Sequence, residues 1–273
     1  MSCSILARGM QRSLRSTLVG VAWFGLAVVG LGNDPAAKTD ADSTDRIDRF
    51  AKGYKLSLGA DKLPLEMQPE PVLRWPNATR DTREGATFVW TLNGRPEAIG
   101  CVWENGGYWA HAFHSLSTSK LIAQHDSRTF WQPEKPGIEF SPFPQAPEPA
   151  DSAVKRLLQM KDLARRFKSR LSDANRKSEE LRLLPRPIYR YKTERKDLID
   201  GALFAFVQGT DPEVVLVLEA DRRDGKSEWR YALTRRTGMA VEADLDEKTI
   251  WSLPGSNGAA DAAWFVGRLG MLN

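Results

Sequence analysis

An internal repeat constrains the fold of this chain more than any other feature of its sequence. When the chain is shifted by 116 residues, residues 69–103 align without a gap with residues 185–219. After a four-residue insertion in the second copy, the match resumes at a shift of 120 and continues to residue 251. Many of the identical pairs are Gly, Pro, Trp or Asp, residues that restrict the backbone or fill a core. We therefore expect the chain to fold one unit twice. The identical pairs are Pro69/Pro185, Pro71/Pro187, Arg74/Arg190, Asp81/Asp197, Gly85/Gly201, Ala86/Ala202, Phe88/Phe204, Pro96/Pro212, Glu97/Glu213, Trp109/Trp229, Ala112/Ala232, Ala123/Ala243, Asp126/Asp246, Thr129/Thr249 and Trp131/Trp251.

Short runs of aromatic and β-branched residues, separated by turn residues, fill each copy and predict β-strands. In the first copy Asn93-Gly94 is a hairpin signal, and in the second copy Gly209-Thr210-Asp211-Pro212 and Asp224-Gly225 are turn signals. The connections are too short for helical crossovers, so we expect the strands to pair antiparallel. The predicted strands of the second copy are Ile188–Lys192, Leu203–Val207, Val214–Glu219, Trp229–Thr234, Met239–Ala243 and Thr249–Leu253.

A helix is expected before each copy. From Asp151 to about Ser172, apolar residues recur at helical spacing and the opposite face is basic. Asp151 or Ser152 can cap the start of this helix. Residues 44–54 show the same spacing before the first copy. The predicted fold class is therefore α+β, an internally duplicated unit of one helix plus an antiparallel β-sheet, used twice.

The chain divides into six expected parts. Six prolines between residues 132 and 149 indicate an extended connector between the repeats. The parts are a signal peptide or membrane anchor (1–32), a flexible linker (33–43), the first α+β repeat (44–133), the Pro-rich connector (134–150), the second α+β repeat (151–254) and a C-terminal tail (255–273).

The N-terminal segment predicts export. Arg8, Arg12 and Arg15 precede an uncharged apolar run, Leu18–Leu31, which is the layout of a secretory signal and is short for a spanning helix. An uncleaved anchor stays open as the alternative, and in both cases the rest of the chain lies outside the cytoplasm, periplasmic or extracellular. Removing these three arginines from the 39 basic residues leaves 36, against 35 acidic ones. The rest of the chain therefore has a net charge close to zero, which gives no reason to expect nucleic acid as a partner.

The second-copy pattern PRPIYRY, followed by DGALFAFVQGTDPE, resembles a family of exported bacterial proteins of unknown function. The resemblance covers most of the chain after the N-terminal segment. It implies export, and it brings no catalytic residue with it.

Three histidines, His111, His114 and His125, are the only candidates for a metal site, with Asp126 as a carboxylate partner. His111 and His114 are three apart on a predicted strand, which places them on opposite faces. Their counterparts in the second copy are Tyr231 and Thr234, so the repeated fold does not require them. We expect no metal, and no cofactor either, because no P-loop or dinucleotide-binding glycine pattern occurs.

Other chemistry receives little support. The recurring acids Glu97/Glu213, Asp81/Asp197 and Asp126/Asp246 lie in or beside predicted turns, where acids are usually turn formers and caps. We expect Arg74 and Arg190 to pair with those acids. Cys101 occupies a predicted strand and is expected to be a small buried side chain. Trp103 has no aromatic counterpart in the second copy and is the candidate for an exposed platform that binds a ligand.

The expected function is a non-catalytic exported binding or scaffold protein of the cell envelope or exterior, with Trp103, His111 and His114 as ligand-binding candidates. Its ligand would be a protein, a peptide or a sugar, and it would meet a membrane only through an uncleaved N-terminal segment. The alternative is an exported hydrolase that uses acidic residues together with His111 and His114. In an enzyme, polar residues unique to one copy should converge in a pocket. In a binding protein, the largest concavity should lie between the halves.

Overall fold

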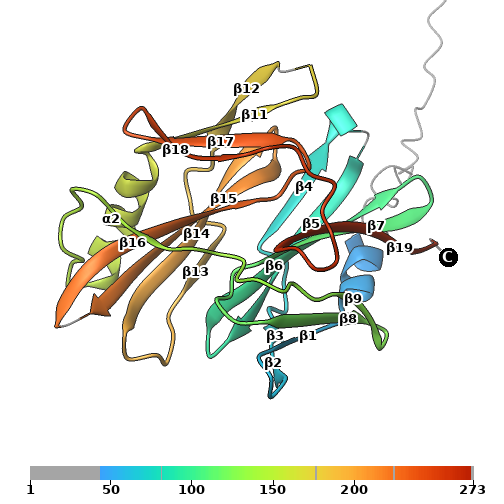
Figure 1. Ribbon diagram of the computed structural model, residues 1–273, viewed down its shortest axis with the longest axis horizontal. Coiled ribbons are helices and arrows are strands. Elements are labelled where there is room, and N and C mark those ends of the chain that lie inside the picture. Colours follow the sequence, from blue (N-terminus) through green and yellow to red (C-terminus); the bar gives the residue numbers. More distant parts are fainter. Residues whose placement is uncertain (1–43, 81, 176, 224, 272–273) are drawn as a thin grey trace, which may run out of the picture.

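The computed structural model describes residues 44–271 except 81, 176 and 224, and it is built mainly of β-strands (Figure 1). Strands contain 55 % of the described residues and helices 10 %. The strands form three antiparallel sheets, one of them a curled half-barrel. The expected α+β class is therefore right in its antiparallel sheets but overstates the helix. The predicted signal or anchor (1–32) and the linker that follows it (33–43) lie outside the described residues.

The second half, residues 151–253, contains one helix and eight strands, which form a curled nine-stranded sheet together with β10 of the connector. Helix α2 spans Ala153–Ala164, and the sheet order is β10-β16-β15-β14-β12-β11-β17-β18, with β13 paired to β14. The strands are β10 (Ser141–Pro142), β11 (Phe167–Ser172), β12 (Ser178–Leu183), β13 (Tyr189–Tyr191), β14 (Leu198–Gln208), β15 (Asp211–Arg223), β16 (Lys226–Arg235), β17 (Ala240–Leu245) and β18 (Lys248–Leu253).

The first half, residues 44–133, follows the same order in two sheets. A helix covers residues 44–51, and the sheets are β7-β6-β5-β3, with β4 on β5, and β2-β1-β8-β9. If the two sheets are joined between β3 and β2, their strand order matches that of the second-half sheet. There the single unbroken strand β12 takes the place of β3 and β2 together. The strands are β1 (Tyr54–Leu58), β2 (Leu63–Pro64), β3 (Glu66–Met67), β4 (Leu73–Asn77), β5 (Thr82–Leu92), β6 (Arg95–Asn105), β7 (Tyr108–Ser115), β8 (Leu121–His125) and β9 (Arg128–Trp131), with a 3-10 turn at Ala78–Arg80.

The registers of the two halves agree residue by residue. Gly85 pairs with Trp103 as Gly201 pairs with Glu219, and Ala123 pairs with Trp131 as Ala243 pairs with Trp251. The irregularities recur as well, since both β5 and its counterpart β14 carry one beside the same aligned position, after Trp90 and after Phe206. A bulge is a specific local device, and its recurrence at one aligned position supports a common unit.

The four-residue insertion extends a hairpin, as its sequence position predicts. The pair Asn105–Tyr108 closes the β6–β7 ladder, and its counterpart is Asp221–Glu228. Beyond that pair the β15–β16 ladder continues with Arg222–Ser227 and Arg223–Lys226. Each strand gains two residues, and the register of the core is unchanged.

The predicted helix over residues 151–172 is too long. It begins where expected, with the Ser152 hydroxyl accepting a hydrogen bond from the Lys155 amide, and ends at Ala164. From Phe167 the chain is a strand whose side chains alternate between buried and more exposed, and which pairs with both β12 and β17. Two flanking strands satisfy the main-chain groups of β11, so sheet formation prevails over the helical spacing.

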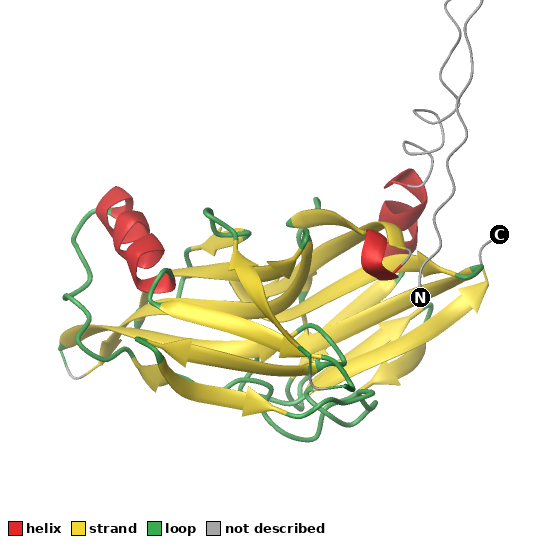
Figure 2. Cartoon of the chain, turned by 90° about the horizontal axis from the view of Figure 1, so that it is seen from above, coloured by secondary structure: helices red, strands yellow, loops and turns green. Residues whose placement is uncertain are grey.

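The two halves pack through the backs of their central strands. Alternate side chains of these strands point into their own half, while the others, including Val89, Ile99, Val215 and Val217, form a shared cluster between the halves. These strands are consequently buried on both faces and read as nearly continuous apolar runs. Helix α2 and the helix of residues 44–51 lie at opposite ends of the molecule on the same side of the strands (Figure 2).

Arg74 and Arg190 form equivalent ion pairs with acids other than those named from the sequence, of which Asp81 lies outside the described residues. Arg74 lies 3.4 Å from Glu84 and 2.6 Å from Asp48, and Arg190 lies 2.6 Å from Asp200, which is the residue aligned with Glu84. The strand geometry explains the contacts with Glu84 and Asp200, because β4 pairs with β5 and β13 with β14, the strands that carry these two acids.

The segment expected as a C-terminal tail contains an additional strand. β19 (Trp264–Met271) pairs with the outer edge of β7, so residues distant in sequence complete the first half. Among the described residues, neither helix has the length and apolar character needed to span a bilayer.

Candidate functional site

In each half we call the gap between the two end strands of the repeated unit its seam. The first seam lies between β7 and β9, and the second lies between their counterparts β16 and β18. The side chains that face each seam come from aligned positions. A comparison of the seams therefore separates what the repeated fold requires from what one half has added.

The C-terminal segment closes the first seam. The Gln132 amide donates to the Ala260 carbonyl (2.7 Å), the Trp131 indole Nε1–H to the Ala262 carbonyl (2.7 Å) and the Ser115 amide to the Ala263 carbonyl (3.0 Å). The first two donors lie at β9 and the third at β7, so residues 260–263 bridge both edges. Phe265 then packs its ring against His111 and Phe130.

The second seam is open. A cavity of about 970 Å³ lies along it, which is at the upper end of the usual range for a ligand site. One wall consists of apolar side chains from β16 and β18, and the opposite wall consists of the Pro-rich connector. The lining residues are Tyr231, Ala232, Leu233, Ile250, Trp251 and Leu253 on the first wall, Lys135–Ser141 on the second, and His114, Thr118, Arg230 and Ala263 around them.

Burial differs between the halves at the seam. Trp131, Phe113 and His111 are 0–1 % exposed, whereas their counterparts Trp251, Leu233 and Tyr231 are half-buried. Away from the seam, the identical aromatic pairs Phe88/Phe204 and Trp109/Trp229 are buried in both halves. One unit folded twice should bury identical aromatic residues equally. Trp131/Trp251 departs from this because only the first seam has a cover.

His111 faces the closed interior of the first half. Its Nδ1 lies 2.8 Å from the Tyr54 hydroxyl, and its ring contacts Phe113, Phe130 and Phe265. Burial lowers the pKa of His111 to about 3, and the nearby His125 contributes to the shift. This neutral imidazole sits inside an aromatic cluster, away from the open cavity.

His114 lies on the opposite face of β7, as the strand spacing predicts, and it contributes to the wall of the cavity. Its Nδ1 lies 2.9 Å from the Ser115 carbonyl, and burial lowers its pKa to about 3. The structure therefore does not bring His111 and His114 together.

Trp103 lies outside the lining of the cavity. It is half-buried, and its ring is 6.2 Å from that of Trp75 within a small apolar cluster. As for the proposed metal ligands, His125 Nδ1 lies 3.1 Å from Asp126 Oδ2. Within the described part of the chain, no group of three or more His, Cys, Asp or Glu side chains is arranged to hold a metal.

The acid Glu213 is not the turn residue that the sequence suggests. It lies within β15, fully buried, with Arg80 Nη2 2.7 Å from Oε1. Burial, with a contribution from the neighbouring Asp211, raises the pKa of Glu213 to about 7. Asn77 and Arg80 bring first-half donors to Asp211, so the pair belongs to the packing between the halves.

Cys101 is buried beside this acid pair, as expected. Its Sγ accepts a hydrogen bond from Arg236 Nη2 at 2.8 Å, and burial raises the pKa of the thiol to about 11. A protonated, enclosed thiol is a poor nucleophile.

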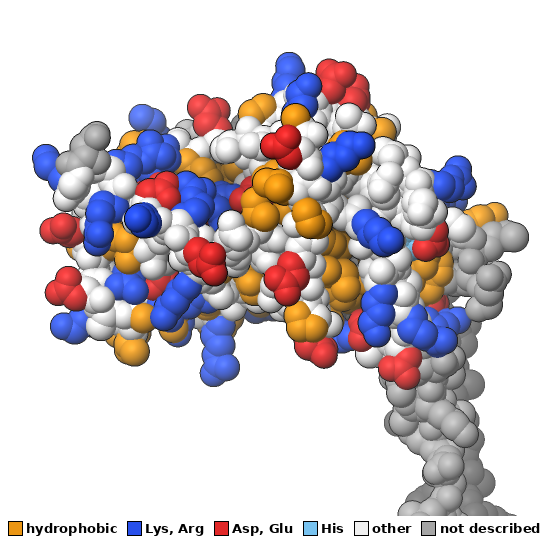
Figure 3. Space-filling model, turned by 90° about the horizontal axis from the view of Figure 1, so that it is seen from below, with side chains coloured by type: hydrophobic (Ala, Val, Ile, Leu, Met, Phe, Trp, Pro, Cys, Tyr) orange, Lys and Arg blue, Asp and Glu red, His pale blue; other side chains and the backbone are white. Residues whose placement is uncertain are grey.

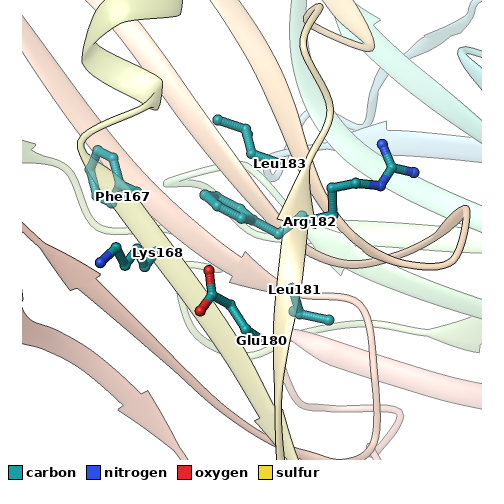
Figure 4. Close-up of a pocket in the computed structure, with 7 residues that line it drawn as sticks. Phe167, Lys168, Glu180, Leu181, Arg182 and Leu183 are labelled. Atoms are coloured by element: carbon teal, nitrogen blue, oxygen red, sulfur yellow. The ribbon is translucent and has the colours of Figure 1, made fainter.

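Two smaller hollows differ in character from the seam cavity. One, of about 350 Å³, opens where β12 leaves β11 to pair with β14, and its lining includes Lys168, Glu180 and Phe206 (Figure 4). The other, of about 500 Å³, lies around Gly238 and Gly255 and is lined mainly by small and polar residues. The first is a corner of the sheet, and the second has no apolar wall comparable to that of the seam.

Comparison with known proteins gives no relative for this chain. No protein-family model matches it, and neither a curated protein nor a solved structure is significantly similar to it.

The sequence contains the residues of the open seam but gives no signal that they are accessible. Tyr231, Leu233 and Trp251 lie at core positions of the repeat, and a core pattern predicts burial. The mismatch His111/Tyr231 and the prolines of the connector are the only hints. Neither hint reveals that a distant C-terminal segment covers one copy and leaves the other open.

Proposed function

We propose that this chain is an exported binding protein without a catalytic role, and that its ligand occupies the cavity along the second seam. The observation that carries this proposal is the unequal burial of Trp131 and Trp251 in two otherwise equivalent units. Half-exposed aromatic and aliphatic side chains that converge on one cavity are costly to leave in water, and covering them is favourable.

The position of the cavity also favours binding over catalysis. His114, Thr118 and Ala263 of the first half, the connector and the second-half strands all border it, so the largest of the cavities described lies between the halves. The polar residues that the sequence analysis names for a hydrolase are dispersed. His111 is enclosed on one face of β7, His114 is on the other, and the acids Asp211 and Glu213 are not among the lining residues.

The charges favour no polyanionic partner. On the face shown in Figure 3, basic and acidic side chains are intermixed around hydrophobic ones. Export rests on the N-terminal segment and on the family resemblance. A ligand met outside the cytoplasm, a protein, peptide or other molecule with a large apolar group, is consistent with both.

A fluorescence titration tests the proposal. The apolar dye 1-anilinonaphthalene-8-sulfonate should bind the full chain at one site, and Trp251→Ala should weaken this binding at least tenfold. Leu158→Ala is the matched control, because Leu158 is a large apolar side chain that is exposed on α2, away from the cavity. Dye binding that is unchanged in a folded Trp251→Ala variant would contradict the proposed site.

A further inference from the structure

We infer that the ligand of the second seam is an extended peptide segment of a partner chain, which adds as a strand to the free edge of β16. This inference rests on the proposed function and names the chemical class of the ligand. The protein itself provides the template, because its own C-terminal segment fills the equivalent place in the first half.

The first seam shows how such a segment binds. Through β19, Phe265 pairs with Phe113 and Trp264 pairs with His114. Because the Ser115 amide points outward to Ala263, the main-chain groups of Phe113, two residues away, point to the same edge. A main-chain ladder therefore holds the segment, while the Phe265 side chain fills the seam.

The second seam offers the same receptors without an occupant. Residues Leu233, Tyr231 and Ile250 are the counterparts of Phe113, His111 and Phe130, and all three line the cavity. The short strand β10 pairs with β16 only at Arg230 and Tyr231. Among the described strands, none pairs with that edge of β16 from Ala232 to Arg235, so the outward main-chain groups of Leu233 are open to a new strand.

The side of β18 provides a further receptor. In the first seam the Trp131 indole donates to a main-chain carbonyl of the inserted segment. Trp251 presents the aligned indole at the wall of the cavity, and the described hydrogen bonds include none from its Nε1. An extended peptide supplies a carbonyl to this indole and an amide and carbonyl to Leu233, which an acyl chain does not do.

The size of the cavity and the template define the ligand. About 970 Å³ accommodates several side chains, and the segment that closes the first seam reads Ala262-Ala263-Trp264-Phe265. We therefore expect small residues beside Trp251, followed by a large apolar residue between Tyr231 and Leu233. This is strand addition at a sheet edge, in which the main chain gives affinity and the pocket gives specificity.

The test uses a fluorescein-labelled heptapeptide, DAAWFVG, with the sequence of residues 261–267. Fluorescence polarisation with the full chain should show saturable binding. The same peptide methylated on the main-chain nitrogen of its Phe should bind at least tenfold more weakly, because that amide faces Leu233 in the predicted ladder. Replacing the Phe with Ala should have a similar effect through the lost side chain. Trp251→Ala should weaken binding, whereas Leu158→Ala should not.

The outcomes separate this inference from the proposed function. If the methylated and unmethylated peptides bind equally, strand addition is wrong. If the anilinonaphthalene dye or a long-chain fatty acid binds in a Trp251-dependent way while the peptide does not, the seam is a ligand site but the ligand is not a peptide. If no probe binds, both proposals fail. A dimer of the chain that the peptide dissociates would make a second copy the occupant and overturn a separate partner.

Discussion

At the scale of single residues, burial changes the acid–base behaviour of this protein more than ion pairing does. The neutral side chains of His111 and His114 are buried in the first half, and the carboxyl of Glu213 is buried between the halves. In all three cases burial is the largest cause of the pKa shift, because the charged form loses its hydration. These shifts act on stability in opposite directions, and each direction can be measured.

His111 and His114 should destabilise the protein in acid. Their folded-state pKa values of about 3 lie below the usual 6.5, so between these values the unfolded chain binds more protons. Their contribution is therefore present above about pH 6.5 and is lost as the pH falls toward 3. Within this range each histidine makes the free energy of unfolding rise with pH by up to about 1.4 kcal/mol per pH unit. Urea unfolding between pH 4 and 6 should show that the free energy of unfolding of His114→Gln rises with pH less steeply than that of the wild-type protein, by about that amount. An unchanged pH dependence would contradict the lowered pKa of His114.

Glu213 should act in the other direction. Its pKa is raised to about 7 from the usual 4.5, so the folded state holds the proton more tightly. The associated stability is fully present below about pH 4.5 and is lost as the pH rises through 7. Arg80, 2.7 Å from Oε1, opposes this effect, but neither carboxylate oxygen accepts a well-formed hydrogen bond among the described residues.

Chemical denaturation of Glu213→Gln at pH 5 and pH 8 measures which effect prevails. The wild-type protein should lose stability relative to the variant on going from pH 5 to pH 8. If the wild-type protein instead gains stability relative to the variant over this range, the ion pair with Arg80 outweighs the cost of burial. That result would overturn the assigned pKa direction.

At the scale of elements, the repeat tolerates change at its hairpin ends and not in its ladders. The insertion in the second copy lengthens β15 and β16 by two residues each, and the added pairs lie at the tip, outside the core. An exposed ladder pair contributes little. The shared register of the strands behind it is what keeps the apolar side chains on the buried faces.

Deleting Arg222, Arg223, Lys226 and Ser227 together should restore the shorter hairpin of the first half. We expect the fold to persist and the free energy of unfolding to change by less than about 1 kcal/mol, because surface changes away from special features are small. The matched deletion of Leu216, Val217, Ala232 and Leu233 removes two core pairs and should abolish cooperative unfolding. Circular dichroism during thermal unfolding distinguishes the two variants, and loss of folding in the tip deletion would contradict the insertion site.

The sequence predicts most strands of the second copy, takes β11 for part of a helix, and does not predict β10, β12 or β19. All six strands predicted for the second copy are present, each close to its expected position, because alternation and turn residues act locally. The residues from Phe167 to Ser172 carry helical spacing and strand alternation at once. Only their long-range pairing with β17 decides between the two, and a local pattern does not contain that information.

At the scale of the whole molecule, the two halves share one topology and differ in what covers them. The cover of the first seam comes from residues 260–265, more than a hundred residues after the strands that it bridges. No periodicity or motif in the sequence marks that contact. For this reason the repeat can be predicted from the sequence while the binding cavity cannot.

The proposed binding site requires the second seam to be open at an edge where the first seam is closed. Amide hydrogen exchange of the free protein tests this claim with aligned pairs in one molecule. The Phe113 amide faces β19 and should be protected, whereas its counterpart Leu233 lies on a stretch of the β16 edge with which no described strand pairs. We predict exchange at Leu233 at least a hundredfold faster than at Phe113, with the inward-facing amides of Ala112 and Ala232 similarly protected. Equal protection of Leu233 and Phe113 would mean that the second edge is already covered, and would contradict the open seam.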